Sequence, residues 1–205
     1  MPFRFAFLII LLPLACRADD LPPVFVKWME NQQKMGRNIE VSFKQERRTP
    51  VLKEPVKTEG RFWKMLDGRF RYELGSPATT VMIYDGAELL LKEGEDAPWQ
   101  TLDPEDKRAT VWKRVLGSRE ADRESLQTNF KSSVTQQEAH FATITLVPRP
   151  LLMRKHLKQI DMQIEPDGER MYLLRVIQGD GAELTIQFDP PKTITGRAEA
   201  LFSAK

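Results

Sequence analysis

The feature that most constrains this chain is a series of short hydrophobic-polar alternations separated by Asp-Gly pairs. These pairs stand at 67–68, 85–86, 167–168 and 180–181. Asp-Gly between two alternating segments is typical of the tight turn of a β-hairpin. Within residues 69–74, we expect Phe70, Tyr72 and Leu74 to share one face and the charged residues between them to share the other. The pattern predicts an antiparallel meander.

The remaining predicted strands have the same alternating or apolar character. They cover residues 39–43, 58–66, 79–84, 88–92, 157–164, 171–177 and 183–188, and between the last helical stretch and residue 157 strands are expected to resume near Phe130 and to run clearly over residues 138–147. Residues 46–56 are charged and contain Pro50 and Pro55. Because proline cannot donate to a central ladder, this segment is predicted to be a loop or a sheet edge. The chain is therefore expected to be mainly β.

A first helix is predicted just after the start of the mature chain. Pro22-Pro23 suits the first turn of a helix, and apolar side chains such as Phe25 and Trp28 follow near helical spacing. Gly36 is a plausible end. We expect this amphipathic helix to pack on the core.

A second helical stretch, residues 103–127, interrupts the strands. Asp103 is a suitable N-cap, and Pro104 stands at the first helical position. Gly117 divides the stretch, so a helical hairpin is predicted. Its apolar stripe consists of Ala109, Trp112, Val115 and Leu116.

Residues 1–18 are predicted to be a secretory signal peptide. Arg4 precedes an unbroken apolar run that is too short to span a bilayer. Cys16 and Ala18 stand at the −3 and −1 positions of a cut before Asp19. Alternatively, Leu14-Ala15-Cys16 resembles the end of a lipobox, in which Cys16 would be lipidated and become the first residue. Both interpretations predict export.

Composition and motifs argue against nucleic-acid binding and against an enzyme. The net charge is +2, and removal of residues 1–18 would leave 29 basic and 29 acidic residues, which gives no global attraction to nucleic acid. With one cysteine, no intramolecular disulfide is possible. His140, predicted in a strand, and His156, predicted in a charged turn, lack partners at metal-ligand spacing. No serine-nucleophile elbow or phosphate-binding glycine loop is present, so we predict no catalytic residue, metal or cofactor.

Large apolar side chains are unusually abundant on the predicted sheet. They must be covered by the first helix and by residues 103–127. These helices either pack directly on a solid hydrophobic core or cover a cavity, and both possibilities stay open at this point.

The order of these segments resembles the outer-membrane lipoprotein carrier protein family, LolA. The resemblance covers most of residues 21–190, and order and spacing carry it more than any single motif. The matching segments are Val41-Ser42-Phe43-Lys44-Gln45, Gly60-Arg61-Phe62-Trp63, residues 68–74 with Pro77, Tyr84-Asp85-Gly86 with Leu89, Leu146-Val147-Pro148, the 167–168 hairpin and Ile186-Gln187-Phe188.

The resemblance implies an incomplete antiparallel β-barrel, or half-barrel, covered by a helical lid, in a single domain of residues 19–205. It implies a monomeric periplasmic carrier of a Gram-negative cell that shields the acyl chains of lipoproteins without a catalytic step. Its partners would be acylated lipoproteins or other lipid cargo, an inner-membrane ABC transporter complex and an outer-membrane receptor lipoprotein. The family's lid is locked by an arginine at the place where this chain has Leu66.

The expected lipid-binding residues follow from the predicted strand faces and the predicted lid. The expected lining residues are Phe62, Phe70, Tyr72, Met82, Leu89, Ile160, Met162 and Ile186. The expected lid or rim residues are Trp99, Trp112 and Leu116. Each could instead be an ordinary core residue.

Three other functions remain as alternatives. The first is a periplasmic sensor of mislocalised lipoproteins on the same scaffold. The second is an outer-membrane receptor anchored by lipidated Cys16, and the third and weakest is an enzyme.

Overall fold

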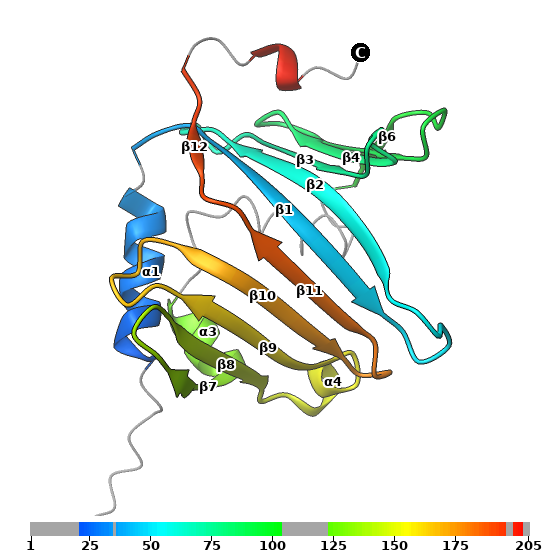
Figure 1. Cartoon of the computed structure of the whole chain (residues 1–205). Coiled ribbons are helices and arrows are strands. Elements are labelled where there is room, and N and C mark those ends of the chain that lie inside the picture. The colour runs from blue at the N-terminus through cyan, green and yellow to red at the C-terminus, as the bar shows by residue number, and fades with distance from the viewer. Residues whose placement is uncertain (1–20, 35, 104–122, 196–198, 203–205) are drawn as a thin grey trace, which may run out of the picture.

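The chain forms a twelve-stranded antiparallel sheet that is open rather than closed (Figure 1). The computed structural model describes residues 21–34, 36–103, 123–195 and 199–202. The strand order is β6-β5-β4-β3-β2-β1-β11-β10-β9-β8-β7, and β12 pairs with β1. Nearly every neighbour in this order is also a neighbour in the sequence. The structure confirms the predicted incomplete antiparallel β architecture.

The bounds of the elements are as follows. The strands are β1 (Ile39–Arg48), β2 (Val56–Lys64), β3 (Phe70–Leu74), β4 (Thr80–Tyr84), β5 (Leu89–Glu93), β6 (Gln100–Leu102), β7 (Phe130–Gln137), β8 (Ala142–Pro148), β9 (Leu157–Ile164), β10 (Met171–Gln178), β11 (Glu183–Phe188) and β12 (Lys192–Thr193). The helices are α1 (Pro23–Lys34), α3 (Arg123–Asn129), α4 (Leu151–Arg154) and the 3-10 helix η2 (Glu199–Phe202).

Two predicted boundaries were wrong. The segment predicted as a loop or a sheet edge from residue 46 instead continues β1 to Arg48, because these residues pair with β11 and β2 while their charged side chains remain partly or fully exposed. The strand predicted over residues 138–147 is a hairpin end followed by β8, so His140 lies in the connection and not in a strand. The helical hairpin predicted over 103–127 falls largely outside the described residues.

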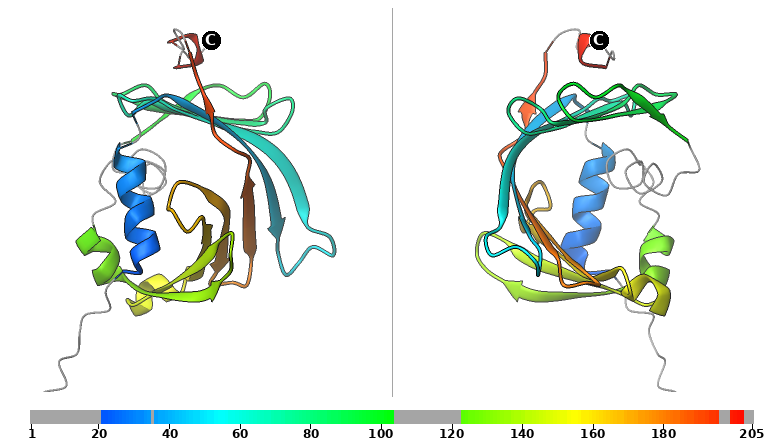
Figure 2. Two further views of the ribbon diagram at one scale, coloured as in Figure 1. Left: turned by 60° about the vertical axis from the view of Figure 1, so that its left-hand side comes forward. Right: turned by 90° about the vertical axis from the view of Figure 1, so that its right-hand side faces the viewer.

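The sheet is strongly curved, and α1 and α3 lie on its concave side (Figure 2). Phe25 and Met29 of α1 are buried against the β8–β9 part of the concave face, where Ile144 and Ile164 are fully buried. This packing explains the amphipathic spacing of α1.

The convex face carries an apolar cluster over β2 to β4, which we call the convex cluster. Trp63, Val81 and Ile83 are buried there with Phe202. Arg71 Nη1 donates a 2.7 Å hydrogen bond to the Leu201 carbonyl, which fixes η2 on this face. The helix η2 therefore covers part of the outside of the sheet.

Candidate functional site: the apolar concave face

One continuous apolar surface covers the concave face over β1 to β6 and β11. Residues paired across antiparallel strands share a face, and Phe62, Tyr72, Met82 and Leu91 are paired in succession from β2 to β5. Its buried members, which we call the concave cluster, are Phe43, Phe70, Tyr72, Met82, Leu89, Leu91 and Leu102, with Phe62, Leu74, Tyr84, Ile186 and Phe188 partly buried beside them.

Aromatic rings hold the middle of the concave cluster together. The ring of Phe43 stacks on Tyr72 with centroids 5.3 Å apart and tilts against Phe188 at 6.3 Å. The ring of Phe70 tilts against the rings of Phe62 and Tyr84, with centroid distances of 6.2 and 5.6 Å. Offset and tilted pairs of this kind add about 0.5–1.5 kcal/mol each beyond area burial.

A glycine in β2 makes room for the Phe43 ring. Gly60 pairs with Phe43 on one side and with Leu74 on the other. A Cβ at Gly60 would stand 2.6 Å from Phe43 Cε2 and 2.5 Å from the Glu73 carbonyl oxygen. The ring therefore lies directly over the glycine backbone.

Burial makes the concave cluster a low-dielectric environment. Burial raises the pKa of the Tyr72 phenol to about 12, because the ionised form is poorly solvated there. The hydroxyl donates to Gln45 Oε1 at 3.4 Å, a polar group on the same face. The surface is thus suited to hydrocarbon, with a few polar groups at its margin.

The structure places all eight predicted lining residues on the concave face. Six belong to or pack against the concave cluster: Phe62, Phe70, Tyr72, Met82, Leu89 and Ile186. Ile160 and Met162 instead lie in the neighbouring cluster beneath α1, with Met162 buried and Ile160 partly buried. Their common face agrees with the predicted alternation, while their role in lipid binding stays a prediction.

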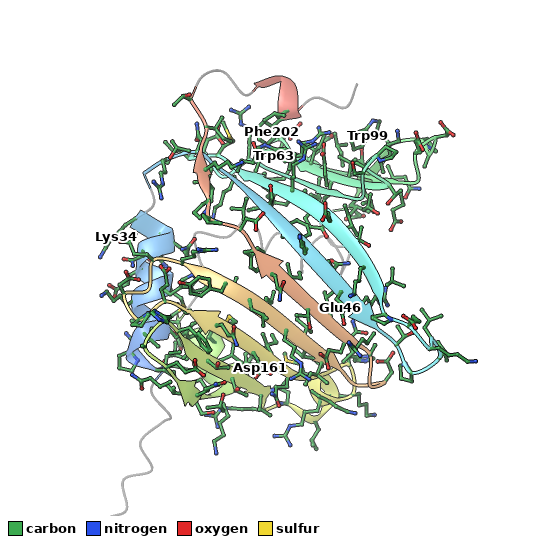
Figure 3. All side chains as sticks on the ribbon, viewed as in Figure 1. Lys34, Glu46, Trp63, Trp99, Asp161 and Phe202 are labelled. Atoms are coloured by element: carbon green, nitrogen blue, oxygen red, sulfur yellow. The ribbon has the colours of Figure 1, made fainter. Side chains whose placement is uncertain are left out.

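The predicted lid and rim residues are placed differently. Trp99 packs in the convex cluster with Trp63 and Ile83, so it does not line the concave face (Figure 3). The alternation rule could not place it, because it precedes the short strand β6. Trp112 and Leu116 lie outside the described residues.

Three residues of the concave cluster, Phe43, Leu91 and Leu102, were not predicted as lining residues. Phe43 was recognised as a strand residue but not as lining, although it shares the alternation of Ile39 and Val41. Leu102 lies at the end of β6, opposite Leu89. Its three-residue strand is too short to show a period.

An open cavity of about 430 Å³ lies between α1 and α3. Its described lining mixes apolar residues such as Leu21 and Val26 with the charged side chains Lys27, Glu30 and Arg123. Among the described residues, no group of histidine, cysteine or carboxylate side chains could hold a metal ion. In that same part of the chain, no helix is long and apolar enough to cross a bilayer.

Comparison with solved structures gives distant similarities that extend over most of this chain. The LolA superfamily protein NE2245 from Nitrosomonas europaea is 8% identical, and the alignment covers 87% of this chain and 97% of that chain with a TM-score of 0.43. LprF from Mycobacterium bovis is 11% identical, with 86% and 97% covered and a TM-score of 0.42. The Pseudomonas aeruginosa MucA/MucB complex gives 14% identity, 87% and 60% coverage and a TM-score of 0.43.

A search of curated proteins finds no match. Residues 35–205, by contrast, match the family described as outer membrane lipoprotein carrier protein LolA. The match begins just before β1 and includes every strand of the sheet. This chain therefore belongs to the LolA family.

Proposed function

We propose that this protein is a carrier that holds the acyl chains of lipoproteins against its concave face while they cross an aqueous compartment. The observation that carries the proposal is the continuous apolar concave surface of an open sheet, on which Phe62, Tyr72 and Met82 lie side by side across three strands. Because the sheet is open, long chains can enter and leave along its open side as well as at its ends.

The energy of hydration makes such a carrier necessary. Each methylene withdrawn from water is worth about 0.8 kcal/mol. A cargo with two or three long chains would thus lose roughly tens of kcal/mol if it were exposed to water. Methionine and aromatic side chains, as at Met82 and Tyr72, can adapt to chains of different shape.

Family membership suggests where such a carrier acts. In this proposal the protein is exported by residues 1–18, receives lipoproteins from an inner-membrane ABC transporter complex and delivers them to an outer-membrane receptor lipoprotein. The balanced charge of residues 19–205 is compatible with a role that needs no nucleic acid.

Residues 103–127 are proposed to act as the lid. Both described ends of this segment meet the concave side, because Leu102 is buried in the concave cluster and Leu126 packs against the cluster beneath α1. In this proposal, the apolar stripe that contains Trp112 contacts the sheet when the carrier is empty and the acyl chains when it is loaded.

A matched pair of substitutions on β11 tests the carrier proposal. Ile186 lies on the concave face and is partly buried, whereas Gln187 lies on the opposite face and is exposed. Ile186→Glu should strongly weaken uptake of a fluorescent fatty-acyl probe, and Gln187→Glu should not. Thermal unfolding of both variants verifies that the sheet remains folded. Equal uptake by both folded variants would refute the proposed site.

Native mass spectrometry of protein taken directly from the periplasm tests the identity of the cargo. Bound acylated lipoprotein is expected. Bound phospholipid alone would change the cargo but keep the site.

A further inference from the structure

Three chain connections meet at one end of the sheet, which we call the loop end. They are residues 49–55 between β1 and β2, residues 149–156 around α4, and residues 179–182 between β10 and β11. The antiparallel pairing of these strands places all three connections at the same end (Figure 1).

Residues 179–182 touch both of the other connections. The Gly179 amide donates a 2.9 Å hydrogen bond to the His156 carbonyl. A Cβ on Gly179 would collide with the Lys155 carbonyl, and one on Gly181 would stand 3.5 Å from Pro50 Cγ. The loop end is therefore one connected surface and not three independent loops.

Apolar side chains are exposed on this surface. Leu151 and Leu152 of α4 are 76% and 75% exposed, and Val51 is 89% exposed on the neighbouring connection. Of the seven large hydrophobic side chains that are exposed in the described part of the chain, five belong to residues 51–56 or to α4. Clustered exposure of this kind marks an interaction site.

Cations surround these apolar tips. Residues 47–57, 149–158 and 179–182 together hold eight lysines and arginines but only two acidic residues, although the whole chain has an excess of only two positive charges. Within the described residues, Lys53, Lys155 and Lys158 make no ion pair, unlike Arg48 and Lys57, which contact Glu46. Their charge is available to an anionic partner.

We propose that the loop end docks onto an anionic lipid bilayer, with the leucine and valine side chains entering the interface and the lysines contacting phosphate headgroups. Exposed apolar side chains flanked by lysine are characteristic of interfacial membrane binding. Protein interfaces, in contrast, are depleted in lysine at their cores and rarely use leucine as an energetic hot spot. This inference goes beyond the proposed carrier function, since it needs no cargo.

Vesicle sedimentation tests the proposal. The full chain, processed in the periplasm and carrying Cys16→Ala so that residue 16 cannot be lipidated, is mixed with vesicles of neutral phosphatidylcholine or of phosphatidylcholine with anionic phosphatidylglycerol. Binding is expected to the anionic vesicles and to weaken at high salt. Each lysine removed should weaken binding about fivefold, so Lys53→Gln, Lys155→Gln and Lys158→Gln combined should lower it roughly a hundredfold.

Leu151→Ser with Leu152→Ser should also abolish binding while leaving the fold intact, because both side chains are mostly exposed. The matched controls lie away from the loop end. They are Lys34→Gln on α1 (Figure 3), whose side chain is 75% exposed, and Leu66→Ser in the β2–β3 connection, at the opposite end of β2 from residues 49–55. Both controls should bind as strongly as the parent.

Three results would overturn the proposal. They are a parent that shows no preference for anionic vesicles, control variants that lose as much binding as the loop-end variants, and loop-end variants that bind vesicles as strongly as the parent. Uptake of the soluble acyl probe by the loop-end variants separates this proposal from the carrier function, because the concave face is unchanged in them.

Discussion

Replacement of Gly60 by alanine should disrupt the middle of the concave face. The new Cβ would stand 2.6 Å from the Phe43 ring and 2.5 Å from the Glu73 carbonyl oxygen, far inside normal contact distance. The ring could rotate away only by giving up its stacking on Tyr72. The carbonyl belongs to the neighbouring strand β3, so it can move only if the sheet itself deforms.

The expected loss in the free energy of unfolding follows from these two contacts. Overpacking a closed site costs typically about 1–3 kcal/mol. For a chain of this length, a loss of about 2 kcal/mol lowers the melting temperature by about 4–8 °C. Thermal unfolding followed by circular dichroism measures this shift directly.

Gly36→Ala is the matched control. A Cβ there would have the Lys34 carbonyl at 3.9 Å as its nearest neighbour, so no clash arises. Its effect should be neutral or slightly stabilising, because alanine restricts the unfolded chain more than glycine does. If Gly60→Ala melts at the parental temperature, the close approach of Phe43 to β2 is not the reason for the glycine in this strand.

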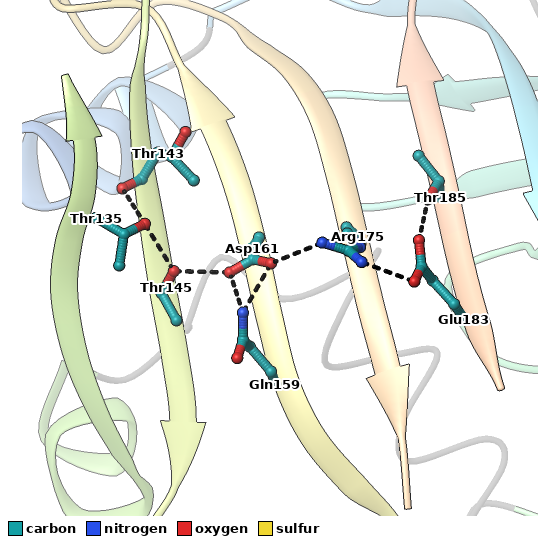
Figure 4. Close-up of polar contacts among 8 residues, drawn as sticks. All are labelled: Thr135, Thr143, Thr145, Gln159, Asp161, Arg175, Glu183 and Thr185. Atoms are coloured by element: carbon teal, nitrogen blue, oxygen red, sulfur yellow. Dashed lines mark hydrogen bonds and ion pairs between the residues drawn. The ribbon is translucent and has the colours of Figure 1, made fainter. Parts of the chain in front are cut away.

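The remaining predictions concern the charged pair on the convex face, the buried phenol and the lid. The hydrogen bond from Arg175 lowers the pKa of Glu183 in the folded state (Figure 4). The ionised Glu183 carboxylate therefore stabilises the fold above pH 4.5, and this stabilisation is lost as the pH falls through the lowered pKa of the folded state. Glu183→Gln should remove this part of the acid dependence of stability, at a cost of at most about 1 kcal/mol at pH 7 for this partly exposed pair. Because the pKa of Tyr72 is raised in the folded state, the protonated phenol contributes fully to stability below pH 10, and this contribution is lost between pH 10 and about 12. An absorbance titration should show one tyrosine that ionises at a higher pH than the others, and this step should be missing in Tyr72→Phe. Trp112→Glu should weaken uptake of the acyl probe without unfolding the sheet, and unchanged uptake would contradict the lid assignment.

Turn chemistry and alternation predicted most of the sheet. The four Asp-Gly pairs all lie in connections between strands, and Asp85 Oδ1 accepts hydrogen bonds from the Ala87 and Glu88 amides, as an aspartate at a turn should. Phe70 and Tyr72 lie on the concave face and Arg71 on the convex face, as their alternation predicted. Local sequence is sufficient here because each strand pairs mainly with its neighbour in the chain.

Residues whose environment depends on distant segments could not be placed. Strands were expected to resume near Phe130, where β7 begins, but the bounds of β7 could not be predicted, because its mostly polar residues gain their setting only from pairing with β8. Thr145 on β8 donates to Asp161 of β9, a contact across strands that no local pattern reveals (Figure 4). Trp63 was counted among the apolar sheet residues, but its face is covered by η2 from the opposite end of the sequence.

The burial of the concave cluster has a consequence for the kind of cargo that such a carrier can accept. Seven large side chains are buried there, and separating them from their present neighbours would cost about 2 kcal/mol each, or roughly 14 kcal/mol together. One sixteen-carbon chain withdrawn from water returns roughly 12 kcal/mol at about 0.8 kcal/mol per methylene. The free energy gained by burying a single acyl chain therefore only about equals the cost of separating the buried side chains. Burial of two or three chains exceeds that cost and favours the loaded state. We expect competition against a fluorescent acyl probe to rank triacylated and diacylated lipopeptides far above a free fatty acid, and equal affinity for all three would mean that cargo binds without displacing the existing packing.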